Sequence, residues 1–131
     1  MKNTDHLIPD TYYHIYNRGN NGELLFKRRE NYEYFLLKYE QYISLIADTM
    51  AYCLLGNHFH FLIHTRSEED ILRINSTNAK EMKKTASKQI SLQFSHLFNG
   101  YTQAFNKQNN RTGKLFELPF RRVAMIPICL A

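Results

Sequence analysis

The stretch HFHFLIHT, residues 58–65, alternates aromatic or aliphatic side chains with histidines, a pattern typical of a β-strand with one buried face. Successive side chains of a β-strand point to opposite faces of a sheet. One face would therefore carry Phe59, Phe61 and Ile63, and the other face would carry His58, His60, Leu62 and His64. We expect helices to pack on the phenylalanine face, which leaves the histidine face uncovered.

Two further strands are indicated on the N-terminal side of this stretch. The apolar run TMAYCLL, residues 49–55, is separated from it only by Gly56 and Asn57, which predicts a β-hairpin with a loop of about two to four residues. The β-branched and aromatic run TYYHIYN, residues 11–17, leads into RGNNG. The glycines and asparagines of RGNNG supply the left-handed backbone conformations of a tight loop.

Apolar residues at helical spacing predict two long helices, over residues 30–47 and 88–107. The polar stretch 67–84 is expected to be a short helix and a mobile connection, and KLFELPF, residues 114–120, an extended segment near a strand end because of Pro119. The order strand, helix, strand, strand, helix, strand predicts an α+β fold. We expect a ferredoxin-like sandwich, an antiparallel sheet with helices on one face.

Length and composition limit the broad class of the protein. The 131 residues fit one domain, 1–131, and no apolar stretch reaches the 18 or so residues of a membrane span. The N-terminus has no apolar signal-peptide core, so we expect a cytoplasmic protein without a membrane partner. Cys53 and Cys129 share no metal-binding or redox spacing, and we expect them to be buried, reduced thiols.

The charge distribution favours a polyanionic partner. The net charge is +5, and between Lys107 and Arg122 five cations face Glu117 alone. Nine tyrosines and nine phenylalanines provide rings that could stack on bases, although most of them must form the core.

His58 and His60 are candidate metal ligands. Residues two apart on a strand lie about 7 Å from each other, so both imidazoles can tilt onto one ion, whereas His64 lies about 13 Å from His60. Such an ion needs further ligands from another residue, from water or from a phosphate oxygen. The alternative is a polar sheet face that holds no ion, and a lone His-x-His pattern does not decide between the two.

Three blocks of sequence together resemble a known family. They are YYHIYNRGNNGELLF at 12–26, AYCLLGNHFHFLI at 51–63 and YTQAFNKQNNRTGKLFELPFRR at 101–122. In this order and spacing they resemble the single-tyrosine HUH transposases of bacterial insertion sequences, and specifically the REP-associated tyrosine transposases. The likeness extends over residues 11–123, and the family fold is the ferredoxin-like sandwich.

The resemblance implies an activity and a metal. His58 and His60 match the histidines that bind a catalytic Mg²⁺ or Mn²⁺ in that family. The family's tyrosine oxygen attacks the phosphate of single-stranded or hairpin DNA and forms a 5′-phosphotyrosine link, which a 3′-hydroxyl can later reverse. The expected function is thus a metal-dependent DNA transposase or endonuclease that needs no nucleotide cofactor, and family precedent allows a homodimer.

The sequence departs from the family after the third block. The family's nucleophilic tyrosine lies on a helix that follows this block, whereas RRVAMIPICLA, residues 121–131, has no tyrosine and contains Pro127. We therefore expect a C-terminal truncation that removes the tyrosine helix, so that the nucleophile is missing and the strand-transfer activity is incomplete in this chain. The substitutes to consider are Tyr12 and Tyr16 on the first strand and Tyr101, whose helical spacing places it in the core.

The resemblance and the cationic residues also indicate DNA contacts. Candidates are Asn17, Arg18, Asn20, Arg111, Lys114, Arg121 and Arg122. Without the resemblance these residues would be a tight turn and a solvated cationic face. Two alternatives to strand transfer stay open: a remnant that binds single-stranded or hairpin DNA without cutting it, and a phosphodiesterase that uses water as nucleophile.

Overall fold

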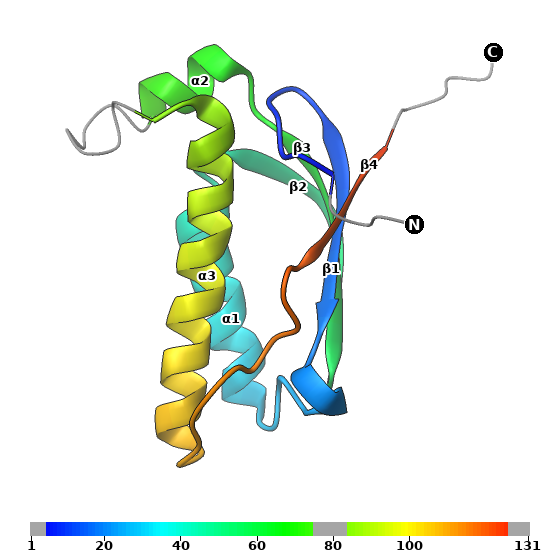
Figure 1. Cartoon of the computed structure of the whole chain (residues 1–131), viewed down its shortest axis with the longest axis vertical. Helices are drawn as coiled ribbons and strands as arrows, with labels where there is room; N and C mark the ends of the chain where they lie inside the picture. The colour runs from blue at the N-terminus through cyan, green and yellow to red at the C-terminus, as the bar shows by residue number, and fades with distance from the viewer. Residues whose placement is uncertain (1–4, 75–83, 126–131) are drawn as a thin grey trace.

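The computed structural model of the chain describes residues 5–74 and 84–125. In this part of the chain, four antiparallel strands form one sheet in the order β2-β3-β1-β4. The strands are β1 (Tyr12–Arg18), β2 (Ala47–Leu55), β3 (His58–Thr65) and β4 (Arg121–Met125). Figure 1 shows α1 (Arg29–Ile43) and α3 (Ala86–Gln108) on one side of the sheet, with α2 (Glu68–Ile74) at one end. The predicted α+β class, with helices on one face of an antiparallel sheet, is confirmed.

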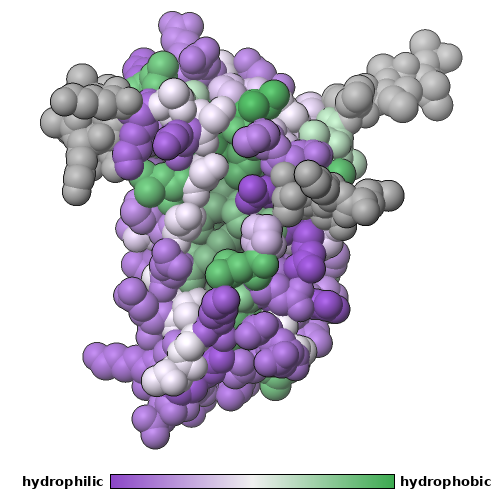
Figure 2. Space-filling model, viewed as in Figure 1, coloured by the Kyte–Doolittle hydropathy of each residue, from purple (hydrophilic) through white to green (hydrophobic). Residues whose placement is uncertain are grey.

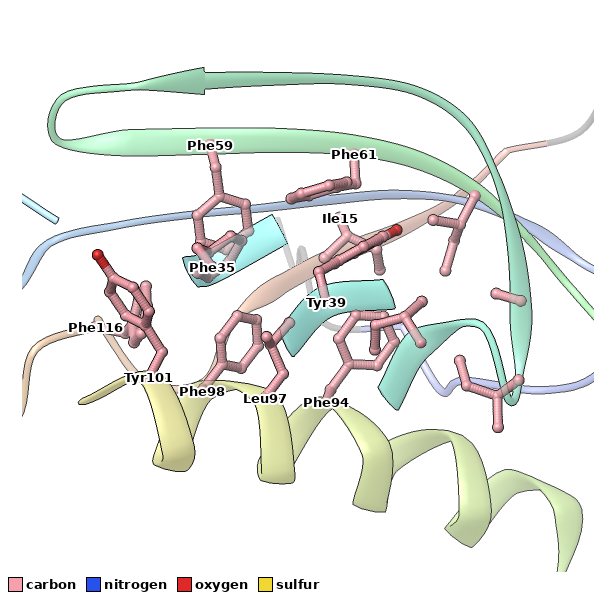
Figure 3. Close-up of a cluster of buried hydrophobic side chains, with 14 of the residues drawn as sticks. Ile15, Phe35, Tyr39, Phe59, Phe61, Phe94, Leu97, Phe98, Tyr101 and Phe116 are labelled. Atoms are coloured by element: carbon pink, nitrogen blue, oxygen red, sulfur yellow. The ribbon is translucent and has the colours of Figure 1, made fainter. Parts of the chain in front are cut away.

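Aromatic rings fill the space between the sheet and the helices (Figure 3). Phe59 and Phe61 of β3 are at most 1% exposed and lie against Phe35 of α1, with ring centroids 5.5 and 6.2 Å from it. Tyr101 of α3 meets the same Phe35 ring edge-on at 5.1 Å. In Figure 2 apolar residues form a band between α3 and the edge of the sheet. The phenylalanine face is therefore the core face, as the alternation in β3 predicted.

A tight loop follows β1 and depends on Gly19. A Cβ atom at this position would lie 1.9 Å from the carbonyl oxygen of Glu23, so only glycine allows the short 3₁₀ turn Asn20–Gly22 to fold back. The amide of Gly19 donates to the carbonyl of Asn57, in the two-residue turn of the β2–β3 hairpin. The loop after β1 and the hairpin turn are thus held together at one end of the sheet.

Element boundaries differ modestly from the sequence prediction. Helix α1 ends at Ile43 rather than at residue 47, because a turn at residues 44–46 brings the chain back into β2. Helix α3 starts at Ala86, where the Thr85 hydroxyl caps it by accepting a hydrogen bond from the amide of Lys88. The short helix predicted within 67–84 is α2, and the connection at 75–83 lies outside the described residues.

The extended segment predicted at 114–120 forms no regular strand. Leu115 and Phe116 turn inward and are 1% and 3% exposed, and in this segment only an isolated bridge between Phe116 and Gly19 is present. Pro119 has no amide hydrogen to donate to a strand ladder. The fourth strand begins after it, at Arg121, and pairs with β1.

The expectation that Cys53 is buried was wrong. Cys53 is exposed because β2 is the outer strand of the sheet, so its open face has a neighbouring strand on one side only. The second cysteine, Cys129, lies outside the described residues.

Gly100 offers a test of helix α3. An added Cβ would meet no atom within 4 Å there, and alanine is favoured over glycine in a helix interior by about 1 kcal/mol. We expect Gly100→Ala to raise the free energy of unfolding by about 0.5–1 kcal/mol in urea denaturation. Gly19→Ala is a control with the opposite expected effect, because its Cβ would clash with the carbonyl of Glu23, and it should lower the free energy of unfolding. A destabilised Gly100→Ala protein would contradict a continuous α3.

Candidate functional site

A hollow of about 310 Å³ lies on the open face of the sheet, at the end where β1 meets the hairpin turn. Its walls come from three strands: His58 and His60 from β3, Tyr16, Asn17 and Arg18 from β1, and Arg121 from β4. The strand register accounts for this grouping. Tyr16 is paired with His60 and Arg18 with His58, while Arg121 is paired with Tyr16 on its other side. Residues far apart in the sequence therefore line one surface.

One ring nitrogen of each of these two histidines is held by a neighbour. The Nδ1 atom of His58 lies 2.8 Å from Oδ1 of Asn57 in the hairpin turn. The Nδ1 atom of His60 lies 2.9 Å from Nε2 of His14. Among the described residues, no hydrogen bond engages Nε2 of either His58 or His60. Each imidazole thus keeps one nitrogen free for another ligand.

His14 and Tyr16 form a stack of rings with His60. The rings of His14 and His60 are 5.1 Å apart and inclined by 19°, and Tyr16 lies 4.5 Å from His14 and 5.8 Å from His60. Partial burial lowers the pKa of both His14 and His60. The charge of His60 further lowers the pKa of His14, and that of His58 further lowers the pKa of His60. Neutral imidazoles are the form that ligates metals.

Glu117 joins the two arginines of the hollow. Its Oε2 accepts a hydrogen bond from Nε of Arg18 at 2.8 Å, and its Oε1 accepts one from Arg121 at 2.7 Å. Desolvation alone would raise the pKa of Glu117, but the hydrogen bonds and charges of the two arginines outweigh it and lower that pKa. Glu117 was not predicted as a site residue. The signal in the sequence was that it is the one acid between Lys107 and Arg122.

Asn17 connects this group to the sheet. Asn17 is 3% exposed. Its side-chain amide nitrogen donates to the backbone carbonyl of Glu117 at 2.7 Å, and its side-chain oxygen Oδ1 accepts from the guanidinium of Arg121 at 3.2 Å. Of the predicted DNA contacts, the structure brings Asn17, Arg18 and Arg121 together beside His58 and His60.

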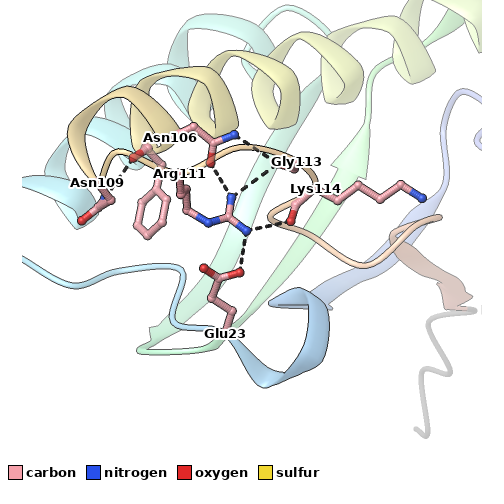
Figure 4. Close-up of polar contacts among 7 residues, drawn as sticks. Glu23, Asn106, Asn109, Arg111, Gly113 and Lys114 are labelled. Atoms are coloured by element: carbon pink, nitrogen blue, oxygen red, sulfur yellow. Dashed lines mark hydrogen bonds and ion pairs between the residues drawn. The ribbon is translucent and has the colours of Figure 1, made fainter.

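Arg111 lies outside the hollow, in a network of intramolecular contacts (Figure 4). Its guanidinium donates to the side chain of Asn106, to the carbonyl of Lys114 at 2.9 Å and to the carboxylate of Glu23 at 2.6 Å. It therefore ties the end of α3 to the loop after β1. Lys114 itself is exposed, and Asn20 lies in the 3₁₀ turn, where its amide donates to Leu115; neither lines the hollow.

Arg122 lies on the other face of the sheet. It pairs with the buried Ile15, and its guanidinium lies over the ring of Phe120 at 4.6 Å on the helix side. Its Nε donates to the carbonyl of Asp5 at 3.2 Å. Consecutive residues of a strand point to opposite faces, so Arg121 and Arg122 cannot both face the hollow.

The three candidate tyrosines occupy different environments. Tyr16 lines the hollow, and its hydroxyl makes no hydrogen bond with any described residue. Tyr12 lies further along β1, with its ring 4.4 Å from that of His64. Tyr101 is 1% exposed and donates its hydroxyl hydrogen to the carbonyl of Leu25, and burial raises its pKa strongly. Of the three, only Tyr16 lies with His58 and His60.

The donor set at the hollow fits a metal ion only with help from other ligands. Two imidazoles with free Nε2 atoms supply the nitrogen ligands that divalent transition ions accept. Within residues 5–74 and 84–125, no group of three or more His, Cys, Asp or Glu side chains is close enough to hold an ion alone. The remaining ligands would have to be water or substrate oxygens, as in catalytic sites that keep open positions.

Comparison with solved structures finds a similar fold. The chain superposes on a REP-associated tyrosine transposase, solved bound to a REP hairpin, with a TM-score of 0.58 and 11% sequence identity. The match covers 95% of this chain and 61% of the other, so this chain spans less than two thirds of the length of its structural neighbour. No family model matches the sequence, and no relative is found among curated proteins. The likeness is one of fold.

Hydropathy adds one finding. Among the described helices, none combines the length and the apolar character that a membrane crossing requires.

The lowered pKa values of His14 and His60 predict how stability depends on pH. The ordinary pKa of histidine is 6.5, and in the folded protein both values lie below it. Just below pH 6.5 the unfolded chain therefore binds more protons than the folded one, so the free energy of unfolding should fall as the pH is lowered through this range. Urea denaturation at about pH 7.5 and about pH 5.5 measures the loss.

His14→Gln is the matched variant for this test. Glutamine can keep a hydrogen bond to His60 but cannot take up a proton, so this variant should lose less stability on acidification. An equal loss in both proteins would contradict a contribution from His14.

Proposed function

We propose that the protein binds single-stranded or hairpin DNA in the hollow and cleaves and rejoins it there through a tyrosine. The observation that carries this proposal is the grouping of His58, His60, Tyr16, Arg18 and Arg121 on one open surface. Two imidazoles, a hydroxyl and two guanidinium groups are the side chains that metal-assisted phosphoryl transfer uses. The fold that the chain shares with a REP-associated tyrosine transposase agrees with this chemistry.

The arginines would bind the DNA backbone. Guanidinium groups pair with phosphate oxygens through several N–H donors. Arg18 is paired with His58, and Arg121 is paired with Tyr16 on the side of β1 away from the histidines. The open sheet face leaves room for an extended strand to lie across them, and Tyr16 and Tyr12 could stack on bases. Such binding should weaken as salt rises.

His58 and His60 would hold Mg²⁺ or Mn²⁺ through their free Nε2 atoms. An ion held there supplies charge stabilisation for a phosphate under attack. The protein's own part is to orient the imidazoles: Asn57 fixes the ring of His58, and His14 fixes that of His60. With His60 as ligand through Nε2, its Nδ1 carries the proton and donates to Nε2 of His14.

Tyr16 is the proposed nucleophile among the described residues. Its oxygen would form a bond to phosphorus while the bond from phosphorus to the 3′-oxygen breaks, which leaves a 5′-phosphotyrosine and a 3′-hydroxyl. The phenol proton passes to water, and the departing 3′-oxygen takes up a proton. Attack by that 3′-hydroxyl on the phosphotyrosine reverses both bonds and rejoins the strand.

His14 gives a test of the metal site that does not depend on catalysis. We expect His14→Ala to weaken Mn²⁺ binding about 10–100-fold, because His60 loses the partner that orients it. His14→Gln should bind better than His14→Ala, since its amide oxygen can accept from His60. Free Mn²⁺ measured by electron paramagnetic resonance reports the affinity.

His64→Ala is the control for this metal titration. His64 is on the same face of β3 but about 13 Å from His60, so its loss should leave Mn²⁺ affinity unchanged. Equal weakening by His14→Ala and His64→Ala would argue against a site at His58 and His60.

The cleavage test uses labelled hairpin DNA, Mn²⁺ and a denaturing gel. We expect a covalent protein–DNA band that is lost in Tyr16→Phe and in the double variant His58→Ala/His60→Ala, and that survives in Tyr12→Phe. Cleavage without a band would favour water as the nucleophile. Binding with neither cleavage nor band would leave DNA binding as the function and rule out strand transfer by this chain.

A further inference from the structure

We propose that the carboxylate of Glu117 takes the place of a DNA phosphodiester between Arg18 and Arg121, and that an incoming DNA strand must displace it. This inference rests on the proposed function, since it assumes that DNA enters the hollow. It assigns to Glu117 the role of an internal competitor that sets the affinity for DNA.

The hydrogen bonds of Glu117 have the pattern that a phosphodiester would make. One carboxylate oxygen accepts from Arg18 and the other from Arg121, at 2.8 and 2.7 Å. A phosphodiester likewise carries one negative charge and two non-bridging oxygens, and guanidinium groups bind both anions in the same way. A DNA phosphodiester can therefore replace the Glu117 carboxylate between these two arginines, and the carboxylate can replace the phosphodiester.

The bridged arginines are the ones that face the reactive groups. Arg18 lies across from His58 and Arg121 across from Tyr16, and both line the hollow. A phosphate bound between them would adjoin the same hollow that His58 and His60 line. The carboxylate thus blocks the cations that the proposed substrate needs. The two arginines alone carry a charge of +2, and together with the carboxylate the three groups carry +1.

The backbone of Glu117 is fixed while its side chain can leave. Its amide donates to the carbonyl of Arg18 at 3.0 Å, and its carbonyl accepts from the buried Asn17 at 2.7 Å. The side chain, in contrast, is 21% exposed and can rotate into solvent. The carboxylate is therefore always near the arginines, at the high effective concentration of a tethered competitor.

The two ion pairs are weak enough to be exchanged. The side chains of Arg18 and Arg121 are 65% and 32% exposed, and pairs in such positions are screened by water and salt. Each guanidinium also keeps N–H groups that Glu117 does not use. A DNA strand can thus approach the arginines before the carboxylate departs.

The test is Glu117→Gln, which keeps the size of the side chain and removes its charge. Binding is measured by fluorescence anisotropy with a labelled single-stranded oligonucleotide at several salt concentrations and without divalent ions, so that no cleavage occurs. We expect Glu117→Gln to bind about fivefold more tightly at low salt. The slope of log affinity against log salt should steepen by about 0.7, the value for one more phosphate neutralised on a single strand.

Glu33→Gln is the matched control. Glu33 is also paired with an arginine, Arg29, but on the exposed surface of α1 with the side chains 66% and 89% exposed. The substitution changes the net charge by the same amount away from the hollow, so its affinity should stay close to that of the wild-type protein. Thermal unfolding of all three proteins checks that they are folded.

The possible outcomes show whether the role of Glu117 fails alone or together with the proposed DNA-binding function. Weaker or unchanged binding by Glu117→Gln, with clear binding by the wild-type protein, would overturn the role of Glu117 and leave DNA binding intact. An equal gain in DNA affinity in Glu117→Gln and Glu33→Gln would mean that net charge alone causes the gain, and this result would also overturn the role of Glu117. Absence of binding by every protein at low salt would overturn the proposed function together with this inference.

Discussion

The antiparallel register of β1 against β3 determines which side chains meet on the open face of the sheet. It places Tyr16 beside His60 and Arg18 beside His58, and it brings His14 within hydrogen-bonding distance of His60. A slip of one residue would turn every side chain of a strand to the other face of the sheet. Because Phe59 and Phe61 are locked among the rings of the core, such a slip would expose the core, and the register is fixed by the same residues that alternate with the histidines.

One-sided packing of the sheet is what leaves this surface open. The helices α1 and α3 cover the phenylalanine face, and no helix of residues 5–74 and 84–125 covers the face with the histidines. The loop after β1 closes one end, since Gly19 is hydrogen-bonded to the hairpin turn and Arg111 ties that loop to the end of α3. The core therefore holds the sheet rigid on the opposite face, and the loop after β1 holds it at one end, while the hollow stays open.

The alternation of β3 was sufficient to predict the core face and the open face, because a period of two is a direct consequence of strand geometry. The fold class followed from the order of strands and helices along the chain. Strand pairing could not be predicted in the same way. The sequence placed Arg121 and Arg122 in one basic patch, but their positions on β4 send them to opposite faces. Glu117 stood out in the sequence only as the one acid between Lys107 and Arg122, and its contacts depend on two arginines from different strands. The local sequence pattern shows which face of a strand a side chain occupies. Contacts between side chains of different strands can be predicted only when the register of the strands is known.

The structure also shows that cations contributing to the positive net charge make different contacts and do not form one basic surface. Of the cations in the third block of sequence, Arg111 is used to hold two segments together and Arg122 lies over an aromatic ring on the helix side. The hollow is left with Arg18 and Arg121, and a carboxylate already bridges them. DNA binding of the proposed kind would therefore draw on more than phosphate contacts by these two arginines. The ring of Tyr16 would add stacking, and the imidazole nitrogens of His58 and His60 would add polar contacts, which the overall charge of the chain does not supply.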